Sequence, residues 1–340
     1  MHQPIHSRII QSGIMISLSG VTKRFGSFTA IEDISFEVAT GEIVGLLGPN
    51  GAGKSTTMRI LAGVFPPTAG SALVGGHDIV TDPLAARATV GYFPERVSAY
   101  QDMTVESYLR YVGRMKGLNR RAAAEQAGVA MDSCALGAVA SRLIGSLSKG
   151  FRQRVGIAQA LTGQPRVLIL DEPTAGLDPE QVAEMRELVR GLHRDRSVVL
   201  SSHILHEVEN TCDRVIILDR GRIIAVDTPV NLNRRVQRAG RVVVEVNGPV
   251  EAVRQHLAGL AGVASIETQQ RSTDGAAAFI IMTDRDRDVR EDIARSVAAK
   301  GWGLRELRSV AFSLEEIFLA LVHHQPPAHS QRDAAGSAHR

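Results

Sequence analysis

A glycine-rich stretch near the start of the chain has the composition of a phosphate-binding loop. Residues 48–56 read GPNGAGKST and match the pattern G-x-x-x-x-G-K-[ST]. Glycines allow the backbone to wrap closely around phosphates, so that consecutive N–H groups and the start of a following helix face the anion. Lys54 would reach the β and γ phosphates of a nucleotide, and the Ser55 hydroxyl would ligate magnesium. The residues expected to surround the phosphates are Gly48, Pro49, Asn50, Gly51, Ala52, Gly53, Lys54, Ser55 and Thr56.

Three polar residues further along the chain would complete such a site. The run VLILDEPTAGLD has four apolar residues, typical of a buried strand, directly before Asp171 and Glu172. Asp171 would point toward the magnesium ion, and Glu172 would lie beside the γ-phosphate, where a base can polarise the attacking water. His203 follows the run SVVLSS and would bring an imidazole to the same phosphate. These residues predict nucleotide hydrolysis.

A second stretch also has the character of an anion site. Residues 146–154 read SLSKGFRQR, which combines a serine, a glycine and three positive charges just before an apolar helical run. One nucleotide bound by one chain has no evident need for two such loops.

The elements that must position these loops alternate between strands and helices. EIVGLL leads into the phosphate loop, VLIL leads to Asp171, and SVVLSS leads to His203, which indicates a parallel β/α arrangement. Between about 97 and 150 the character is helical, with Thr104 as a plausible N-cap. The apolar stripe expected on this helical block consists of Val105, Leu109, Val112 and Met115.

The last third of the chain predicts a separate unit. Residues 231–240 are polar and arginine-rich and are expected to form a linker. The segments beyond the linker alternate as βαββαβ, which is a ferredoxin-like order. These segments are the strand 241–246, the helix 249–259, the strands 263–269 and 276–283, the helix 286–300 and the strand 303–309. A final amphipathic helix is expected to begin at Ser313, which has capping-box spacing to Glu316.

The bulk composition is that of an ordinary globular protein and restricts the possible partners. The 340 residues include 39 basic and 36 acidic side chains, a formal net charge of +3 that gives no reason to expect nucleic-acid binding. The two cysteines have no zinc or redox spacing. Apolar runs are far shorter than the roughly 20 residues that a membrane span requires. Residues 1–14 and 323–340 are expected to be disordered extensions.

Taken in order, these motifs resemble the nucleotide-binding subunit of ABC transporters, over about residues 15–226. The resemblance implies an α/β P-loop NTPase with a RecA-like core, an antiparallel β subdomain and an inserted α-helical subdomain, here followed by the α+β ferredoxin-like domain at 241–322. It implies that Phe25 stacks on adenine, where the family usually has tyrosine, although a core position is the alternative. The roles implied are catalysis for Lys54, Glu172 and His203, nucleotide contact for Phe25, Ser148, Gly150 and Asp178, and metal binding for Ser55, Glu95 and Asp171.

The resemblance also answers why there are two loops. In the family, two copies close head to tail around two ATP molecules with Mg²⁺, and the loop at 146–154 of one copy meets the γ-phosphate held by the other. The individual roles of Lys149, Arg152 and Arg154 stay open. Two positions depart from the family pattern: Glu95 replaces the usual glutamine, and LSKGF replaces the usual LSGGQ. We expect Glu95 mainly to link the nucleotide to a docked partner.

Within the family, the chain looks most similar to ATPases paired with ABC-2-type permeases, especially the gliding-motility-associated and drug-export branches. This implies a separate transmembrane partner and a cytoplasmic protein held at the inner face of the cell membrane. Residues 95–103 would face the permease, with Tyr100 either a contact or a core residue. A soluble ABC ATPase acting on ribosomes or DNA would usually have two cassettes or a long coiled coil, and a P-loop kinase or GTPase would not require the full set of motifs.

Overall fold

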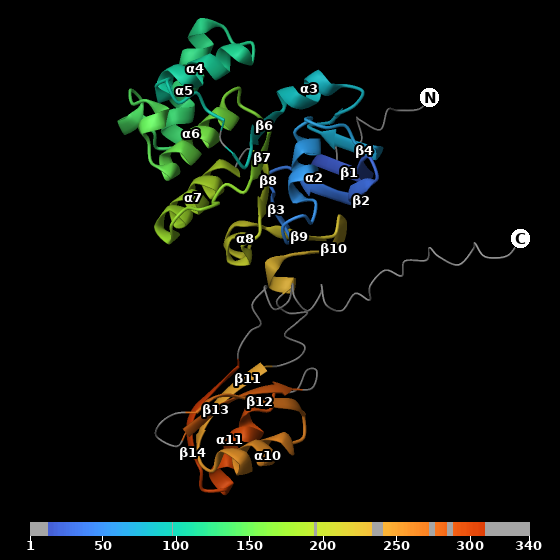
Figure 1. The fold of residues 1–340 in the computed structure, drawn as a ribbon, viewed down its shortest axis with the longest axis vertical. Helices are drawn as coiled ribbons and strands as arrows, with labels where there is room; N and C mark the ends of the chain where they lie inside the picture. The colour runs from blue at the N-terminus through green and yellow to red at the C-terminus, as the bar shows by residue number, and fades with distance from the viewer. Residues whose placement is uncertain are drawn as a thin grey trace, which may run out of the picture. The chain divides into compact units, whose positions relative to one another are not determined.

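The computed structural model describes residues 13–96, 98–193, 196–232, 241–271, 276–283 and 288–309. The chain divides into two compact units, Met1–Pro229 and Val230–Arg340 (Figure 1). Among the residues that the structure describes, no helix has both the length and the apolar character needed to span a membrane.

A six-stranded sheet in the order β10-β9-β3-β8-β7-β6 forms the centre of the first unit. All neighbouring strands are parallel except the pair of β9 and β10. Every residue of β3, β7 and β8 is buried, which explains their nearly continuous apolar sequences. The strands are β3 (Ile43–Leu47), β6 (Val90–Phe93), β7 (Val167–Asp171), β8 (Ser197–Ser202), β9 (Arg214–Asp219) and β10 (Arg222–Asp227).

An antiparallel sheet in the order β2-β1-β4-β5 forms a second layer of this unit. Ile34, Phe36 and Val38 alternate toward its buried face, as side chains of a half-buried strand do. One hydrophobic cluster joins these residues to Met58 of α2 and Ile169 of β7, so α2 packs between the two sheets. The elements of this layer are β1 (Ile14–Phe25), β2 (Phe28–Ala39), α2 (Lys54–Leu61), β4 (Ala69–Val74), β5 (His77–Asp78) and α3 (Pro83–Ala88).

The helical block lies on the other side of the parallel sheet from β1 and β2 (Figure 1). Thr104 is the N-cap of α4, as expected, because its side chain accepts a hydrogen bond from the Ser107 N–H. The predicted stripe is wrong at Met115, which is 69% exposed. Gly113 is buried on α4 instead, where a Cβ atom would lie 3.0 Å from the Cβ of Ala123 on α5. The block consists of α4 (Val105–Met115), α5 (Arg120–Ser133), η1 (Gly137–Val139), η2 (Ile144–Ser146) and α6 (Lys149–Leu161), and α7 (Pro179–Leu192) and α8 (Leu205–Thr211) follow later in the chain.

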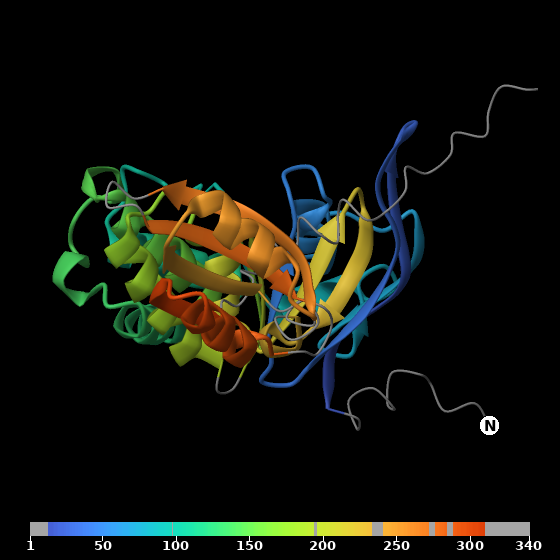
Figure 2. The same ribbon diagram turned by 90° about the horizontal axis from the view of Figure 1, so that it is seen from below.

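The second unit has the predicted ferredoxin-like order. Its antiparallel sheet runs β12-β13-β11-β14, and its two helices bury Val253 and Ile293 against the same face of that sheet (Figure 2). The elements are β11 (Arg241–Asn247), α10 (Val250–Ala258), β12 (Val263–Arg271), β13 (Ala276–Thr283), α11 (Arg290–Ala299) and β14 (Gly303–Ser309). Most of the predicted linker, the two predicted disordered extensions almost entirely, and the helix predicted from Ser313 lie outside the described residues.

Candidate functional site

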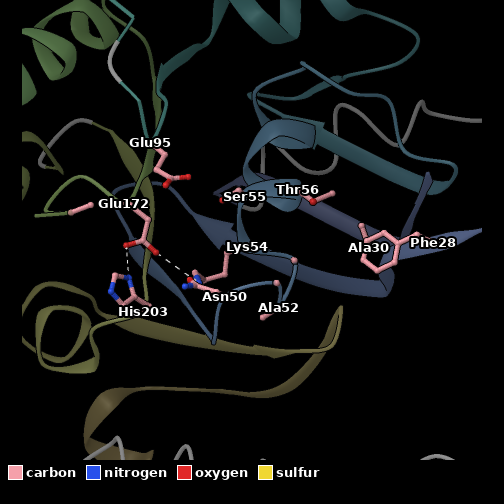
Figure 3. A pocket seen from close by; sticks show the side chains of 13 residues that line it. Phe28, Ala30, Asn50, Ala52, Lys54, Ser55, Thr56, Glu95, Glu172 and His203 are labelled. Atoms are coloured by element: carbon pink, nitrogen blue, oxygen red, sulfur yellow. Dashed lines mark hydrogen bonds and ion pairs between the residues drawn. The ribbon is translucent and has the colours of Figure 1, made fainter. Parts of the chain in front are cut away.

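The candidate site lies where the parallel strands end. The carboxyl ends of β3, β6, β7 and β8 share one edge of the sheet, and ligands of open α/β sheets bind at that edge. The phosphate loop, residues 48–56, follows β3, Glu172 follows β7, His203 follows β8 and Glu95 follows β6. These segments enclose a cavity of about 480 Å³ (Figure 3). Its lining consists of Phe28, Ala30, Asn50, Gly51, Ala52, Gly53, Lys54, Ser55, Thr56, Glu95, Glu172, Ala175 and His203.

The phosphate loop requires glycine at its two ends. At Gly48, a Cβ atom would lie 2.3 Å from the carbonyl oxygen of Leu218. Gly53 is the N-cap of α2 and has a φ of +103°, a conformation that side chains disfavour. The loop therefore turns tightly into α2, whose first N–H groups have no partner within the helix and are suited to binding an anion.

Lys54 is held inside this loop with its charge partly compensated. Its Nζ donates to the carbonyl oxygens of Gly48 (2.8 Å) and Pro49 (3.2 Å) and lies 3.8 Å from Glu172 Oε1. Burial lowers the pKa of Lys54, and the nearby carboxylates of Glu172 and Asp171 oppose that effect. An arriving phosphate would supply negative charge to this desolvated ammonium group.

Asp171 and Ser55 form an oxygen-rich corner that fits magnesium. The Ser55 hydroxyl donates to Asp171 Oδ1 at 3.2 Å, and the Ser201 hydroxyl donates to the same oxygen at 2.7 Å. Asp171 Oδ2 is buried and has no hydrogen-bond partner among the described residues. Burial raises the pKa of Asp171. A hard cation that prefers carboxylate and hydroxyl oxygens would relieve both the desolvation and the unpaired oxygen.

Glu172 and His203 form a pair beside the phosphate loop. His203 Nδ1 and Glu172 Oε2 lie 2.9 Å apart (Figure 3). Glu172 has a φ of +52°, which is unusual for a residue with a side chain, and its N–H donates to the Ser201 hydroxyl. Such strained residues cost about 1–3 kcal/mol and concentrate at functional sites. The arrangement can hold a carboxylate base over the phosphate position with an imidazole at its side.

The aromatic residue at the cavity differs from the predicted one. Phe25 is 44% exposed and packs edge-on against Phe65 at a centroid distance of 5.7 Å, so it is not a core residue, but it does not line the cavity. Phe28, which pairs with Phe25 across the turn between β1 and β2, does line it. In Figure 3, Phe28 lies at the opposite end of the cavity from His203. The prediction missed Phe28, for which the only sequence signal was a large apolar residue next to a glycine turn.

The second loop lies at a different cavity. Ser148 is the N-cap of α6, and it lines, with Gly150 and Asp178, a cavity of about 430 Å³ that shares no lining residue with the first. Asp178 is the N-cap of α7 and accepts a hydrogen bond from the Gln181 N–H at 2.9 Å. Of the predicted site residues, the structure thus brings Glu95, Asp171, Glu172 and His203 to the phosphate loop of the same chain. It leaves Ser148, Gly150 and Asp178 elsewhere.

The positive charges of the second loop differ in their surroundings. Arg152 donates to the Leu147 carbonyl oxygen, and Arg154 forms an ion pair with Glu184 at 2.6 Å, so both contribute to packing within the chain. Lys149 is exposed, and its ammonium group lies against Gly176, where a Cβ atom would be only 2.1 Å away. Lys149 is therefore next to the segment that precedes α7.

Comparisons with known proteins agree with this geometry. A family model described as ABC transporter matches residues 31–175. The chain is 34% identical to the linearmycin resistance ATP-binding protein LnrL of Bacillus subtilis (strain 168), covering 75% of this chain and 83% of that protein. It is 34% identical to the Nod factor export ATP-binding protein I of Burkholderia lata, covering 90% and 96%. A solved ATP-binding subunit of an ABC transporter superposes with a TM-score of 0.59 at 30% identity, covering 65% of this chain and 93% of that one. The chain therefore belongs to the ATP-binding proteins of ABC transporters and is an ATPase of that family.

Proposed function

We propose that two copies of this chain close head to tail around two Mg-ATP molecules and drive export through a separate ABC-2-type permease. The observation that carries the proposal is the separation of the two loops. The phosphate loop and the Ser148–Gly150 loop line different cavities of one chain, so one copy alone does not assemble both around one phosphate group. Head-to-tail pairing would bring the second loop of each copy to the phosphate loop of the other.

The residues of the first cavity would each have a separate role in binding and hydrolysing ATP. Lys54 and the N–H groups of the phosphate loop would hold the β and γ phosphates, and Phe25 or Phe28 would contact the adenine at the far end. Magnesium, held by Asp171 and Ser55 with Glu95 nearby, would neutralise phosphate charge. Glu172 would accept the proton of the water that attacks the γ-phosphorus, while His203 keeps the Glu172 carboxylate in place.

The second cavity would complete the site in the other copy. Ser148 and the N-terminus of α6 offer a hydroxyl and unpaired N–H groups, which are suited to a γ-phosphate. Gly150 has no side chain, so a phosphate could approach its backbone closely. A Cβ atom at this position would also lie only 2.9 Å from the Gln181 side chain. Asp178 stands at the start of α7, beside this opening.

The role in export is supported by the relatives and by one exposed surface. The names of two relatives state linearmycin resistance and Nod factor export. Tyr100 is 53% exposed and packs edge-on against Tyr108 and Tyr111, so it is a surface residue rather than part of the core. We assign residues 95–103 to permease docking, which would hold the protein at the cytoplasmic face of the membrane. Residues 15–230 would form the ATPase domain, and 241–322 an accessory domain that supports dimerisation.

Head-to-tail pairing should appear in the concentration dependence of hydrolysis. Because each complete site needs two copies, we expect the ATPase rate per mole of protein to rise with protein concentration and then level off. Chelating magnesium should abolish the activity and its concentration dependence together. The measurement is steady-state phosphate release over a dilution series. A rate per mole that is constant down to dilutions where gel filtration shows only monomer would contradict the proposal.

Glu95, which stands where the family usually has glutamine, should matter more for coupling to the permease than for hydrolysis itself. Glu95 lines the ATP cavity and also a third cavity, which Arg96 and Gln101 line with it and which is distinct from the cavity at Ser148. We expect Glu95→Gln to lower the ATPase rate of the isolated subunit by less than about tenfold, well below the 10²–10⁴ typical of a general base. Stimulation of that rate by the permease should be lost. If Glu95→Gln abolished hydrolysis as fully as Glu172→Gln, the coupling role would be wrong.

A further inference from the structure

We propose that Glu207 is a positioning residue that couples the segment 175–178 to the His203–Glu172 pair. This inference deepens the proposed function and rests on it. Residues 175–178 lead from Glu172 to the second cavity, which is the cavity proposed to meet the opposite copy. Glu207 was not among the site residues expected from the sequence.

Glu207 is a buried carboxylate with two hydroxyl donors. It is 7% exposed, and its Oε2 accepts hydrogen bonds from Ser202 Oγ at 3.0 Å and from Thr174 Oγ1 at 2.5 Å. A buried carboxylate without partners would be strongly unfavourable, so these two bonds are needed to keep it there. Bonds to an ionised acceptor are roughly twice as strong as neutral ones. Glu207 thus fixes both hydroxyls to one point.

The two hydroxyls lie in the segments that carry the catalytic pair, Thr174 just after β7 and Ser202 at the end of β8. Thr174 stands two residues after Glu172 and directly before residues 175–178, and Ser202 directly precedes His203. Ser202 Oγ also accepts the N–H of Ile204 at 2.9 Å, which fixes the turn on the other side of His203. Glu207 thus connects the segment after β7 with the end of β8. The 2.9 Å contact between Glu172 and His203 connects the same two segments a second time, so the contacts form a closed ring.

The helix that carries Glu207 is seated firmly on the sheet. Val208 is fully buried, and a Cβ atom at Gly45 of β3 would lie only 2.4 Å from Val208 Cγ1, so α8 and β3 are in close contact. Glu207 also stands in the first turn of α8, where the helix dipole favours a negative charge. The Glu207 carboxylate is consequently held in a fixed position. It holds Thr174 directly and His203 through the adjacent Ser202.

The hydrogen bonds of Glu207 can therefore transmit a movement of residues 175–178 to the Glu172–His203 pair. A displacement of residues 175–178 by the opposite copy would move Thr174 and, through Glu207 and Ser202, the backbone that carries His203. Without the carboxylate, Thr174 and Ser202 would lose their shared acceptor, and His203 would no longer be held at Glu172. The expected consequence is slow hydrolysis with normal ATP binding.

The test compares variants of the full-length protein. We expect Glu207→Ala to lower kcat by about 10- to 100-fold, the range for a small misplacement of catalytic groups, with the KM for ATP unchanged. Glu207→Gln should restore most of kcat, because its amide oxygen can accept both hydroxyls. Thr174→Val should reduce kcat, and the double variant Thr174→Val/Glu207→Ala should lose no more than Glu207→Ala alone, since both changes break one contact.

The controls separate positioning from general stability. His206→Ala, on the exposed side of α8, should leave kcat unchanged, and thermal melting should show that the Glu207→Gln and Thr174→Val proteins are folded. Loss of stability with normal kcat in Glu207→Ala, multiplicative losses in the double variant, or a Glu207→Gln protein as slow as Glu207→Ala would each overturn the inference. If wild-type activity does not depend on concentration but the Glu207 pattern holds, the head-to-tail pairing fails and the positioning role stands.

Discussion

Glu172→Gln is expected to stop ATP hydrolysis while leaving ATP binding intact. The amide has the shape of the carboxylate but cannot accept a proton from the attacking water, so the rate should fall by about 10²–10⁴. Glu172 is 8% exposed and lies 2.9 Å from His203, and glutamine would keep both the packing and an oxygen toward the imidazole. The loss should therefore appear in kcat and not in the affinity for ATP.

Because hydrolysis would normally separate the two copies, the same variant should accumulate as a dimer. The measurement is the mass of the Glu172→Gln protein by light scattering, with and without saturating Mg-ATP, beside steady-state phosphate release. Glu187→Gln, an exposed change on α7 at a position that lines neither cavity, is the matched control and should behave as the wild type. Near-normal hydrolysis in Glu172→Gln would contradict the assignment of the base, and a monomer at saturating ATP would count against the ATP sandwich.

The sequence predicted well those features that depend on local pattern. The buried runs of β3, β7 and β8 could be recognised because strands covered on both faces contain little but apolar residues. Parallel strands place their carboxyl ends at one edge, so the meeting of Lys54, Asp171 and His203 followed from the order of elements. The βαββαβ order of the second unit was readable for the same reason, since its strands and helices differ in hydrophobic period.

Other features depend on contacts that no local pattern encodes. Met115 continues the helical spacing of Val105 and Leu109, yet it is exposed, and the close packing against α5 occurs at Gly113 instead. Phe28 rather than Phe25 lines the cavity, although the two residues pair across the same turn between β1 and β2. Glu207 stands in a short polar helix and looks like a solvated charge until the chain brings Thr174 and Ser202 to it.

Ser148→Arg is the second change with a large expected effect, and it acts on the opposite copy. Ser148 is exposed at the start of α6 and lies at a cavity separate from the phosphate loop of its own chain. Arginine is far bulkier and would fill the space that the γ-phosphate of the other copy is proposed to enter. We therefore expect normal ATP binding to the monomer, no ATP-driven dimer, and loss of hydrolysis approaching that of Glu172→Gln.

The decisive form of this experiment places Ser148→Arg in the Glu172→Gln background. The single Glu172→Gln protein should double its mass with Mg-ATP, whereas the double variant should remain a monomer that still binds a fluorescent ATP analogue. Ser133→Arg in the same background adds the same charge and bulk at an exposed position at the end of α5 that lines neither cavity, and it should still dimerise. Dimerisation of the double variant would show that Ser148 does not meet the partner's nucleotide. Loss of ATP binding by its monomer would show instead that Ser148 serves the nucleotide of its own chain, which the separation of the two cavities argues against.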